Sequence, residues 1–147
     1  MVAFRLHHPA PPGPVTAMTP ASTPQSRAAD ALAFFREHLV GHFRAEEDVL
    51  FPALRARLAA DAPRTALLDG LVAEHRRLEA LRDGVAAAGE DEAALAPALA
   101  AFADLLEAHV RCEERELFEV VPDVLAAGDT EALEAAIRTA LGTRPAA

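Results

Sequence analysis

The sequence predicts an all-α fold, a bundle of three long helices and a shorter fourth one in a single domain. Apolar residues make up 52% of the 147 residues, Ala is frequent, and Trp and Tyr are absent, which is a composition that favours helices. Over long stretches the apolar side chains recur at alternating spacings of three and four, so that they share one face of a helix. The chain length is that of one domain with one core.

Residues 1–26 are predicted to form an irregular lead rather than a helix, because prolines remove backbone donors and push the preceding residue out of the helical region. The prolines of this stretch are Pro9, Pro11, Pro12, Pro14, Pro20 and Pro24. The first helix is expected from about Arg27 to Ala60. Its apolar stripe contains Leu32, Phe35, Leu39, His42, Glu46, Val49 and Ala53.

A break at residues 61–64, which contains Pro63, precedes a second helix that is expected from about Thr65 to Ala88. Gly89 is well placed to end this helix. Its inner side contains Leu68, Leu71, His75, Leu78 and Val85.

A third long helix is expected from about Asp91 to Ala127, with Gly128 as its stop signal. Pro97 is tolerated only in the first turn or two. The inner residues are Leu95, Phe102, Leu105, His109, Glu113, Val120 and Val124. A short fourth helix, about Thr130 to Leu141, can cap the bundle in the helical domain of residues 27–141, which leaves a tail at 142–147. The fourth wall of the bundle comes from the lead, from this helix or from a second subunit.

One segment of the chain occurs twice. Residues 42–51 (HFRAEEDVLF) return 67 positions later as residues 109–118 (HVRCEERELF), and each copy contains H-x-x-x-E. That spacing is one helical turn, so the His and the Glu of each pair share a face. A third pair, His75 and Glu79, stands between the copies. Short loops make the three long helices run up, down and up, which places the three inner His at similar depth.

A single H-x-x-x-E is more often a solvated pair, and a single His on an apolar face is more often a satisfied core residue. Here three His (His42, His75, His109) and two Glu (Glu46, Glu113) lie in the middle of apolar stripes. A buried carboxylate is costly without a partner, and a divalent cation removes that cost. The following residues, Glu47 and Glu114, are expected to point outward as solvated charges.

The types of the candidate ligands limit which metal ions the site can bind. Imidazole and carboxylate without a thiolate cluster suit iron, manganese or zinc, and two carboxylates able to bridge suggest two metal ions. A ferritin-like site would need E-x-x-H, but Leu39, Val72 and Leu106 stand three residues before the inner His. The zinc-protease motif H-E-x-x-H is also absent from the sequence.

Charge and composition exclude other classes of function. The formal net charge is −9 with Arg and Glu interleaved, which argues against a nucleic-acid-binding surface. The sequence has no uninterrupted apolar run of membrane-spanning length and no secretory apolar run at its start. A single cysteine, Cys112, has no intramolecular disulfide partner. We therefore expect a cytoplasmic protein that contacts neither nucleic acid nor membrane.

The chain resembles the hemerythrin and HHE cation-binding family over roughly residues 27–127. Three stretches are similar to the family's second, third and fourth helices: HFRAEEDVLFPAL, LVAEHRRLEAL and HVRCEERELF. The resemblance implies an up-and-down four-helix bundle around a non-haem di-iron centre. It implies that the two irons are bridged by carboxylates and by an oxo or hydroxo group.

Carried over to this chain, the resemblance gives Glu46 and Glu113 the role of bridges and His42, His75 and His109 the role of terminal ligands. At Glu79 some members have a further His. This residue is therefore a ligand, an outer hydrogen-bond acceptor, or a salt-bridge partner of Arg82 or Arg76.

The family's first helix normally donates another His, and this chain has a Pro-rich stretch at that place. His7 and His8 lie about the right distance ahead of His42, but Pro9 follows at once. His38, one turn before His42, is an alternative ligand. Without such a ligand, one metal keeps an open position, the site holds a single metal, or the site is degenerate.

Three functions follow from this resemblance. The first is a di-iron protein that binds or senses the diatomic ligand O₂ or NO, in a stress response or in iron handling. The second is a di-iron oxidoreductase or peroxidase, in which Cys112 takes part, or a protein that repairs iron centres. The third is a metal-free helical interaction module. A three-helix core with exposed apolar surface would also favour a homodimer.

Overall fold

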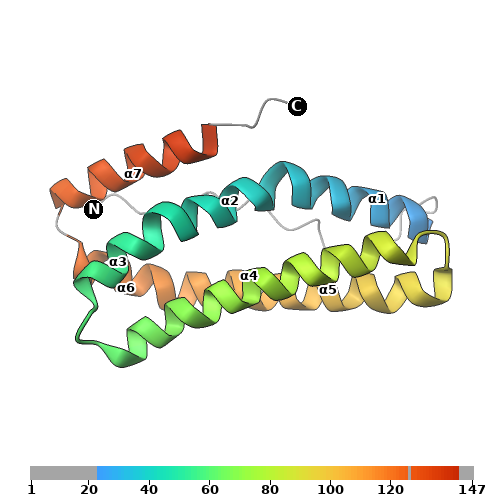
Figure 1. The fold of residues 1–147 in the computed structure, drawn as a ribbon, viewed down its shortest axis with the longest axis horizontal. Coiled ribbons are helices and arrows are strands. Elements are labelled where there is room, and N and C mark those ends of the chain that lie inside the picture. The colour runs from blue at the N-terminus through green and yellow to red at the C-terminus, as the bar shows by residue number, and fades with distance from the viewer. Residues whose placement is uncertain (1–22, 126, 143–147) are drawn as a thin grey trace.

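The computed structural model describes residues 23–125 and 127–142, and every element within these ranges is helical (Figure 1). The helices are α1 (Pro24–Phe34), α2 (Val40–Ala45), α3 (Phe51–Arg57), α4 (Ala62–Ala88), α5 (Glu92–Cys112), α6 (Phe118–Val124) and α7 (Ala127–Gly142). Five-residue π-helical turns at Phe35–Leu39, Glu46–Leu50 and Glu113–Leu117 join α1 to α2, α2 to α3 and α5 to α6. The predicted all-α fold is thus confirmed.

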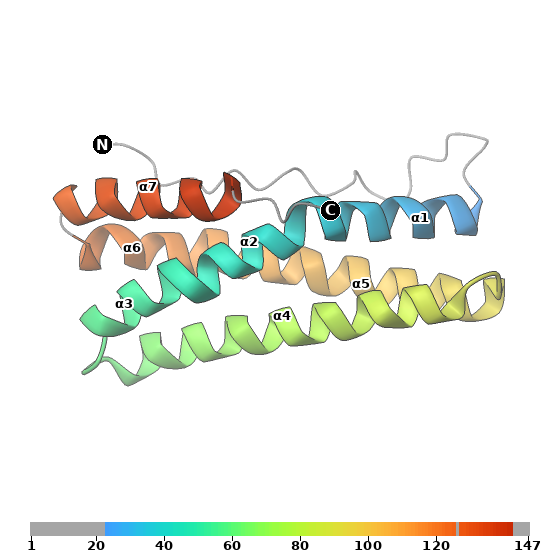
Figure 2. The same cartoon turned by 45° about the horizontal axis from the view of Figure 1, so that its top comes forward.

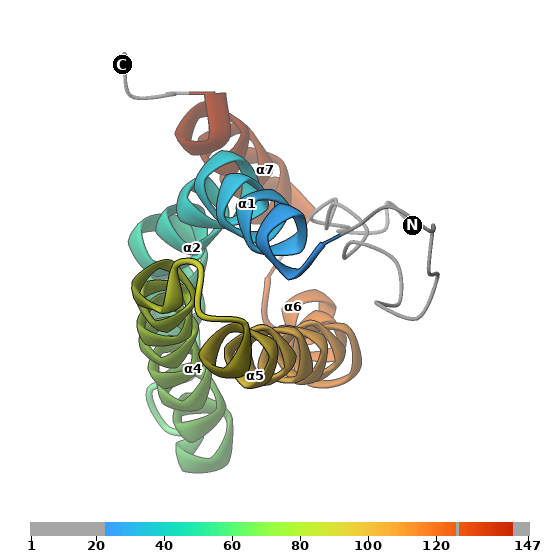
Figure 3. The same cartoon turned by 90° about the vertical axis from the view of Figure 1, so that its right-hand side faces the viewer.

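The long helical stretches run up, down and up, as Figures 1 and 2 show. Residues 24–57 form the first stretch, α4 the second and residues 92–124 the third. Seen end-on in Figure 3, α1, α4 and α5 lie at three corners around the core. The shorter helix α7 packs on α2 and on the π-helical turn that follows it.

The core consists of two apolar clusters, one at each end of the bundle. The cluster nearer α1 contains Phe35, Leu39, Phe43, Leu78, Val85, Leu95, Phe102 and Leu106, together with Ala28. The cluster nearer α3 contains Leu50, Phe51, Leu54, Leu68, Leu71, Leu117, Val120 and Val121, among others. Leu133 and Ile137 of α7 are buried in this second cluster. The last helix therefore supplies part of the fourth wall, which the sequence left open. Residues 1–22 of the predicted lead, with His7 and His8, lie outside the described residues, and its residues 24–26 belong to α1.

Two prolines that we expected to break helices in fact begin them. The first helical stretch starts at Pro24 rather than Arg27, because the Thr23 side chain accepts a hydrogen bond from the Ser26 amide at 3.1 Å. Helix α4 starts at Ala62 rather than Thr65, with an Asp61 carboxylate capping the Arg64 amide at 3.0 Å. Proline suits a first turn, since the missing N–H has no helical partner there.

Other ends of the helices differ from the prediction as well. The first stretch ends at Arg57, three residues before the predicted Ala60, and the third ends at Val124. Gly128 is not a stop signal, because it lies inside α7. The chain reverses at Leu125, whose backbone is extended (φ −106°, ψ 127°) while its side chain stays buried.

Two predictions about helix ends are confirmed. Gly89 follows α4 with φ +55°, a left-handed conformation that side chains disfavour. Pro97 lies in the second turn of α5, which begins at Glu92 after the Asp91 cap.

The sequence repeat is also a repeat of backbone geometry. In the first copy the Phe51 amide donates to the Glu46 carbonyl, and in the second the Phe118 amide donates to the Glu113 carbonyl. Both bonds span five residues, as in a π-helix, and both begin at a predicted ligand. Such wide turns occur mostly as single turns inside α-helices and frequently at functional sites.

The third helical stretch, Glu92–Val124, is long enough, and over one 18-residue window apolar enough (mean hydropathy 1.4), for a membrane span. A helix in the core of a bundle passes the same test. Only 22% of that window is buried, and the inner face of this stretch includes His109, which is 1% exposed.

Candidate metal centre

A layer of ionisable side chains separates the two apolar clusters. Its members are His42, Glu46, His75, His109 and Glu113, the residues that the sequence placed in the middle of apolar stripes. None is more than 5% exposed. The structure therefore brings the five predicted inner residues together.

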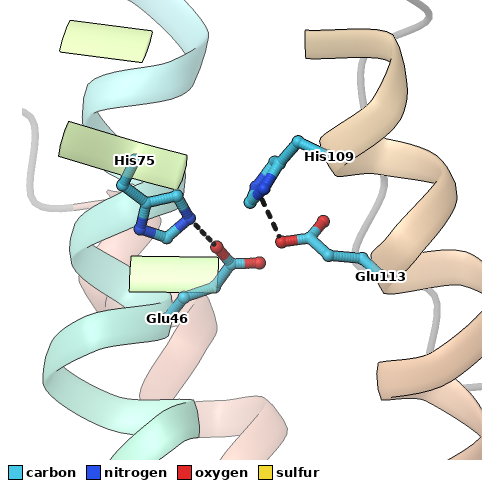
Figure 4. A group of neighbouring side chains, drawn as sticks. All are labelled: Glu46, His75, His109 and Glu113. Atoms are coloured by element: carbon cyan, nitrogen blue, oxygen red, sulfur yellow. Dashed lines mark ion pairs between the residues drawn. The ribbon is translucent and has the colours of Figure 1, made fainter. Parts of the chain in front are cut away.

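Four of these side chains point toward one another from three different helical stretches (Figure 4). Glu46 comes from the first stretch, His75 from α4, and His109 and Glu113 from the third. One ligand atom of each lies within 4.8 Å of one ligand atom of every other. Bonds of about 2.1 Å leave the donors of one metal ion roughly 3–4 Å apart, so these atoms are close to that arrangement but slightly more widely spaced.

The carboxylates lie between the imidazoles. Nε2 of His42 is 3.0 Å from one oxygen of Glu46, and Nε2 of His75 is 3.1 Å from the other. Nε2 of His109 is 3.0 Å from Oε1 of Glu113, whose Oε2 lies 3.9 Å from Nε2 of His42. Each carboxylate thus presents its two oxygens to two different imidazoles.

The donor set fits a bound cation. Both oxygens of Glu46 and the Nε2 atoms of His75 and His109 are buried, and none of them makes a hydrogen bond with a described residue. Buried polar atoms of this kind are costly when they lack partners. A divalent cation would bind the imidazole lone pairs and neutralise the carboxylates, so the residues present fit a metal ion.

Two further carboxylates contact the far side of the imidazoles. Nδ1 of His75 lies 2.8 Å from Oε1 of Glu47, and Nδ1 of His109 lies 2.8 Å from Oε2 of Glu74. Because a carboxylate can only accept, each Nδ1–H is the donor. In the neutral form of each ring, Nε2 then has its lone pair toward the cluster.

The prediction that Glu47 is a solvated outward charge is wrong. Its side chain is 19% exposed, because His75 of α4 lies against it, with Nδ1 2.8 Å from Oε1 of Glu47. Glu114 is exposed, as predicted. The sequence reasoning also missed Glu74. The signal for both is adjacency, since Glu47 follows the candidate ligand Glu46 and Glu74 precedes the candidate ligand His75.

The structure places two other candidate residues away from the cluster. Glu79 pairs with Arg76 at 3.2 Å, which is the salt-bridge alternative, and its side chain is 37% exposed. His38 is exposed and packs on Phe34, with ring centroids 5.1 Å apart.

Burial and charge act in opposite directions on His42. Desolvation lowers the pKa of this imidazole, but the carboxylates of Glu113 and Glu46 outweigh it and raise the pKa from 6.5 to about 10. Desolvation also opposes a raised pKa at His109, where Glu113 and Glu74 prevail in the same way. Without a cation the imidazoles of His42 and His109 thus hold a proton more tightly, and binding a cation would displace it.

Cys112 lies beside the centre but in an unreactive state. Its thiol is free and half-buried against the cluster nearer α3. Burial first, and then the charges of Glu116, Glu74 and Glu113, raise its pKa to about 11. The thiol therefore stays protonated near neutral pH, whereas reactive cysteines have lowered pKa values.

A family model, the hemerythrin HHE cation binding domain, matches residues 15–121. This chain belongs to the hemerythrin HHE family. The matched range contains both copies of the repeat and all the residues of the buried layer. No curated protein and no solved structure matches the chain. The chain is thus an HHE cation-binding domain with a buried His and Glu cluster that fits a metal ion.

Proposed function

We propose that this HHE domain holds a non-haem di-iron centre with which it binds or senses O₂ or NO. The observation that carries the proposal is the buried cluster of Glu46, His75, His109 and Glu113, with His42 beside it. Imidazole and carboxylate donors without thiolates suit iron, although manganese and zinc accept the same donors.

The placement of the carboxylates supports two ions rather than one. The oxygens of Glu46 face His42 and His75 at 3.0 and 3.1 Å, so this carboxylate can bridge between ions that the two imidazoles hold. Glu113 lies in the same way between His109 and His42. Three imidazoles and two carboxylates leave a pair of irons short of ligands, which supports an open position for a small molecule.

Ferrous iron with an open coordination position binds O₂ or NO. The protein's own contribution is to keep the centre dry and its ligands oriented. The Phe43 ring stacks on His75 with centroids 3.9 Å apart and an interplanar angle of 14°. Phe51 lies 6.0 Å from the same imidazole. Because the ligands are at most 5% exposed, a ligand of two atoms suits this centre better than a large substrate.

Elemental analysis tests the metal part of this proposal. Protein purified without chelator is compared with the Glu46→Ala, Glu113→Ala double variant, whose folding is checked by circular dichroism. We expect about two irons per chain in the wild type and none in the variant. Zinc or manganese in place of iron would overturn the iron assignment, and no metal in the wild type would favour the metal-free module.

Spectroscopy under anaerobic conditions tests the ligand. Iron(II)-loaded protein is titrated with NO and, separately, with O₂, while the optical and electron paramagnetic resonance spectra are recorded. We expect an NO spectrum that the double variant lacks. Rapid oxidation of the iron by O₂ with no adduct, together with no response to NO, would refute the ligand part.

The two alternatives have less support. A peroxidase that uses Cys112 would need a thiolate, and the pKa of about 11 keeps this thiol protonated. A metal-free module would leave the fully buried Glu46 carboxylate, among the described residues, with only the imidazoles of His42 and His75 beside it, at 3.0 and 3.1 Å.

Location and assembly belong to the proposal as well. A cytoplasmic, reducing location agrees with the free thiol of Cys112. Leu141, at 46%, is the one large hydrophobic side chain classed as exposed among the described residues, which gives little apolar surface for a homodimer.

A further inference from the structure

Glu47 and Glu74 lie outside the cluster and contact the Nδ1 atoms of the imidazoles, on the side away from the cluster. Both contacts measure 2.8 Å, from Glu47 to His75 and from Glu74 to His109. The carboxylates are partly accessible, at 19% and 27% of their side chains, whereas the imidazoles are 0% and 1% exposed. Water therefore has little access to the Nδ1 atoms, and the carboxylates are their acceptors.

From these contacts we infer that Glu47 and Glu74 are positioning residues, which hold the Nε2 atoms of His75 and His109 toward the metal and so determine how long the protein retains it. The inference rests on the proposed function, because it needs a bound metal. A hydrogen-bonded Nδ1–H fixes both the tautomer and the orientation of a ligand imidazole. Without its acceptor, each ring would bury an unsatisfied donor and could turn.

The two contacts link the three helical stretches in sequence. Glu47, next to the ligand Glu46, holds the imidazole of α4, and Glu74, next to the ligand His75, holds the imidazole of α5. Each of these two stretches thus provides a metal ligand and the acceptor for a ligand on the next stretch. The orientation of the donors therefore depends on helix packing.

The two contacts are not equivalent. The second oxygen of Glu47 pairs with Arg76, which also binds Glu79, at a hollow of about 420 Å³. Among the described residues Glu74 forms no pair with an arginine. The negative charge of Glu47 is shared between the guanidinium of Arg76 and His75, whereas the charge of Glu74 acts mainly on His109. Loss of Glu74 should therefore have the larger effect.

The repeat provides a matched control. Glu114 follows the ligand Glu113 as Glu47 follows Glu46, and the two positions are 67 residues apart. Glu114 is exposed. Removing it changes the net charge by the same amount as removing Glu47, at an equivalent place in the sequence.

The test measures release of iron. Wild type, Glu47→Ala, Glu74→Ala and Glu114→Ala are loaded anaerobically with ferrous iron, and transfer to an excess of a coloured chelator is followed. We expect release to be about 10- to 100-fold faster in Glu47→Ala and Glu74→Ala, with the larger factor in Glu74→Ala, and unchanged in Glu114→Ala. Glu47→Gln and Glu74→Gln retain an acceptor oxygen and should recover part of the loss.

A second readout separates positioning from general destabilisation. Zinc-loaded protein is diamagnetic, so the ring N–H protons of His75 and His109 are observable by nuclear magnetic resonance. We expect both to exchange slowly in the wild type, and each to exchange rapidly only in the variant that lacks its own acceptor. Equal release rates and slow exchange in all variants would overturn the inference. A wild type that retains no metal would instead overturn the proposed function, and the inference with it.

Discussion

The two copies of the repeat, residues 42–51 and 109–118, have the same geometry within each helix but different surroundings. In both, the distance from the His Nε2 to the nearest oxygen of its Glu is 3.0 Å. Both continue as a π-helical turn, and both bury the Leu four residues after the Glu, Leu50 and Leu117, at 0% exposure. The residue after the ligand differs, because Glu47 contacts His75 while Glu114 is exposed.

This difference separates what a helix determines by itself from what its neighbours determine. The His and Glu of each copy are one turn apart, so their contact follows from the local sequence. The contact of Glu47 depends on α4 lying beside the first stretch. Similar sequences therefore give similar His and Glu pairs, and helix packing decides which further carboxylate contacts Nδ1 of an imidazole.

The largest effect should come from removing one carboxylate. Glu46→Ala and Glu113→Ala should each abolish the stabilisation by metal, because each carboxylate lies between two imidazoles. At free metal a thousand times the Kd, that stabilisation is about 4 kcal/mol. Thermal melting with metal and with chelator measures it. If only one of the two variants lost the metal effect, the copies would not be equivalent as ligands.

Leu50→Ala and Leu117→Ala test the equivalence of the copies in the core. Both side chains are fully buried in the cluster nearer α3, so each variant leaves a cavity. We expect the free energy of unfolding to fall by about 3 kcal/mol in each, within the usual range for such changes. Denaturation with urea in the presence of chelator gives both values without the contribution of metal. Values that differ by more than about 2 kcal/mol would show that α7, which packs on one copy, supports them unequally.

The sequence predicted the helices and the buried His and Glu residues because both follow from local periodicity. His42 and Glu46 lie in an apolar stripe, and such a stripe identifies the buried face of a helix whichever neighbouring helix covers it. The positions of the helix ends were predicted less well, because prolines and capping residues compete there over a few residues. Pro24 and Pro63 either break or begin a helix, and the caps at Thr23 and Asp61 decide in favour of a beginning.

Contacts between helices could not be predicted in the same way. Glu47 and Glu114 both follow a Glu in the repeat, although Asp48 comes after the first and Arg115 after the second, and neither context indicates which of the two contacts a His of another helix. Glu74 contacts His109 across 35 positions of the chain. The π-helical turns were also missed, since their wide hydrogen bonds have no simple signature in the residue types.

The charge on His42 and His109 gives a pH-dependent effect. The folded pKa of His42, about 10, lies above its ordinary value of 6.5. Its contribution to the stability of the metal-free protein is therefore complete below pH 6.5 and is lost as the pH rises toward 10. The pKa of His109 is raised as well, so it acts in the same direction. Each His changes the stability by at most about 1.4 kcal/mol per pH unit.

Melting curves of chelated protein between pH 6.5 and 10 measure this effect. The melting temperature should fall with pH in the wild type, and less steeply in His42→Gln and in His109→Gln. Metal affinity should change in the opposite direction, because a cation competes with the protons for Nε2. A melting temperature that is independent of pH would show that the imidazoles are neutral in the metal-free protein.

The smallest effect should come from the one position where the repeat replaces a small apolar residue with a cysteine. Cys112 corresponds to Ala45, which is buried at 1% exposure, so Cys112→Ala makes the second copy like the first. We expect a loss of stability of about 1 kcal/mol or less, because the half-buried thiol behaves as a small apolar group. Iron content and the rate of peroxide consumption should equal those of the wild type, since a thiol with a pKa of about 11 is not a nucleophile at neutral pH. A marked loss of peroxide consumption with the iron retained would instead assign a redox role to Cys112 and make the second copy chemically different from the first.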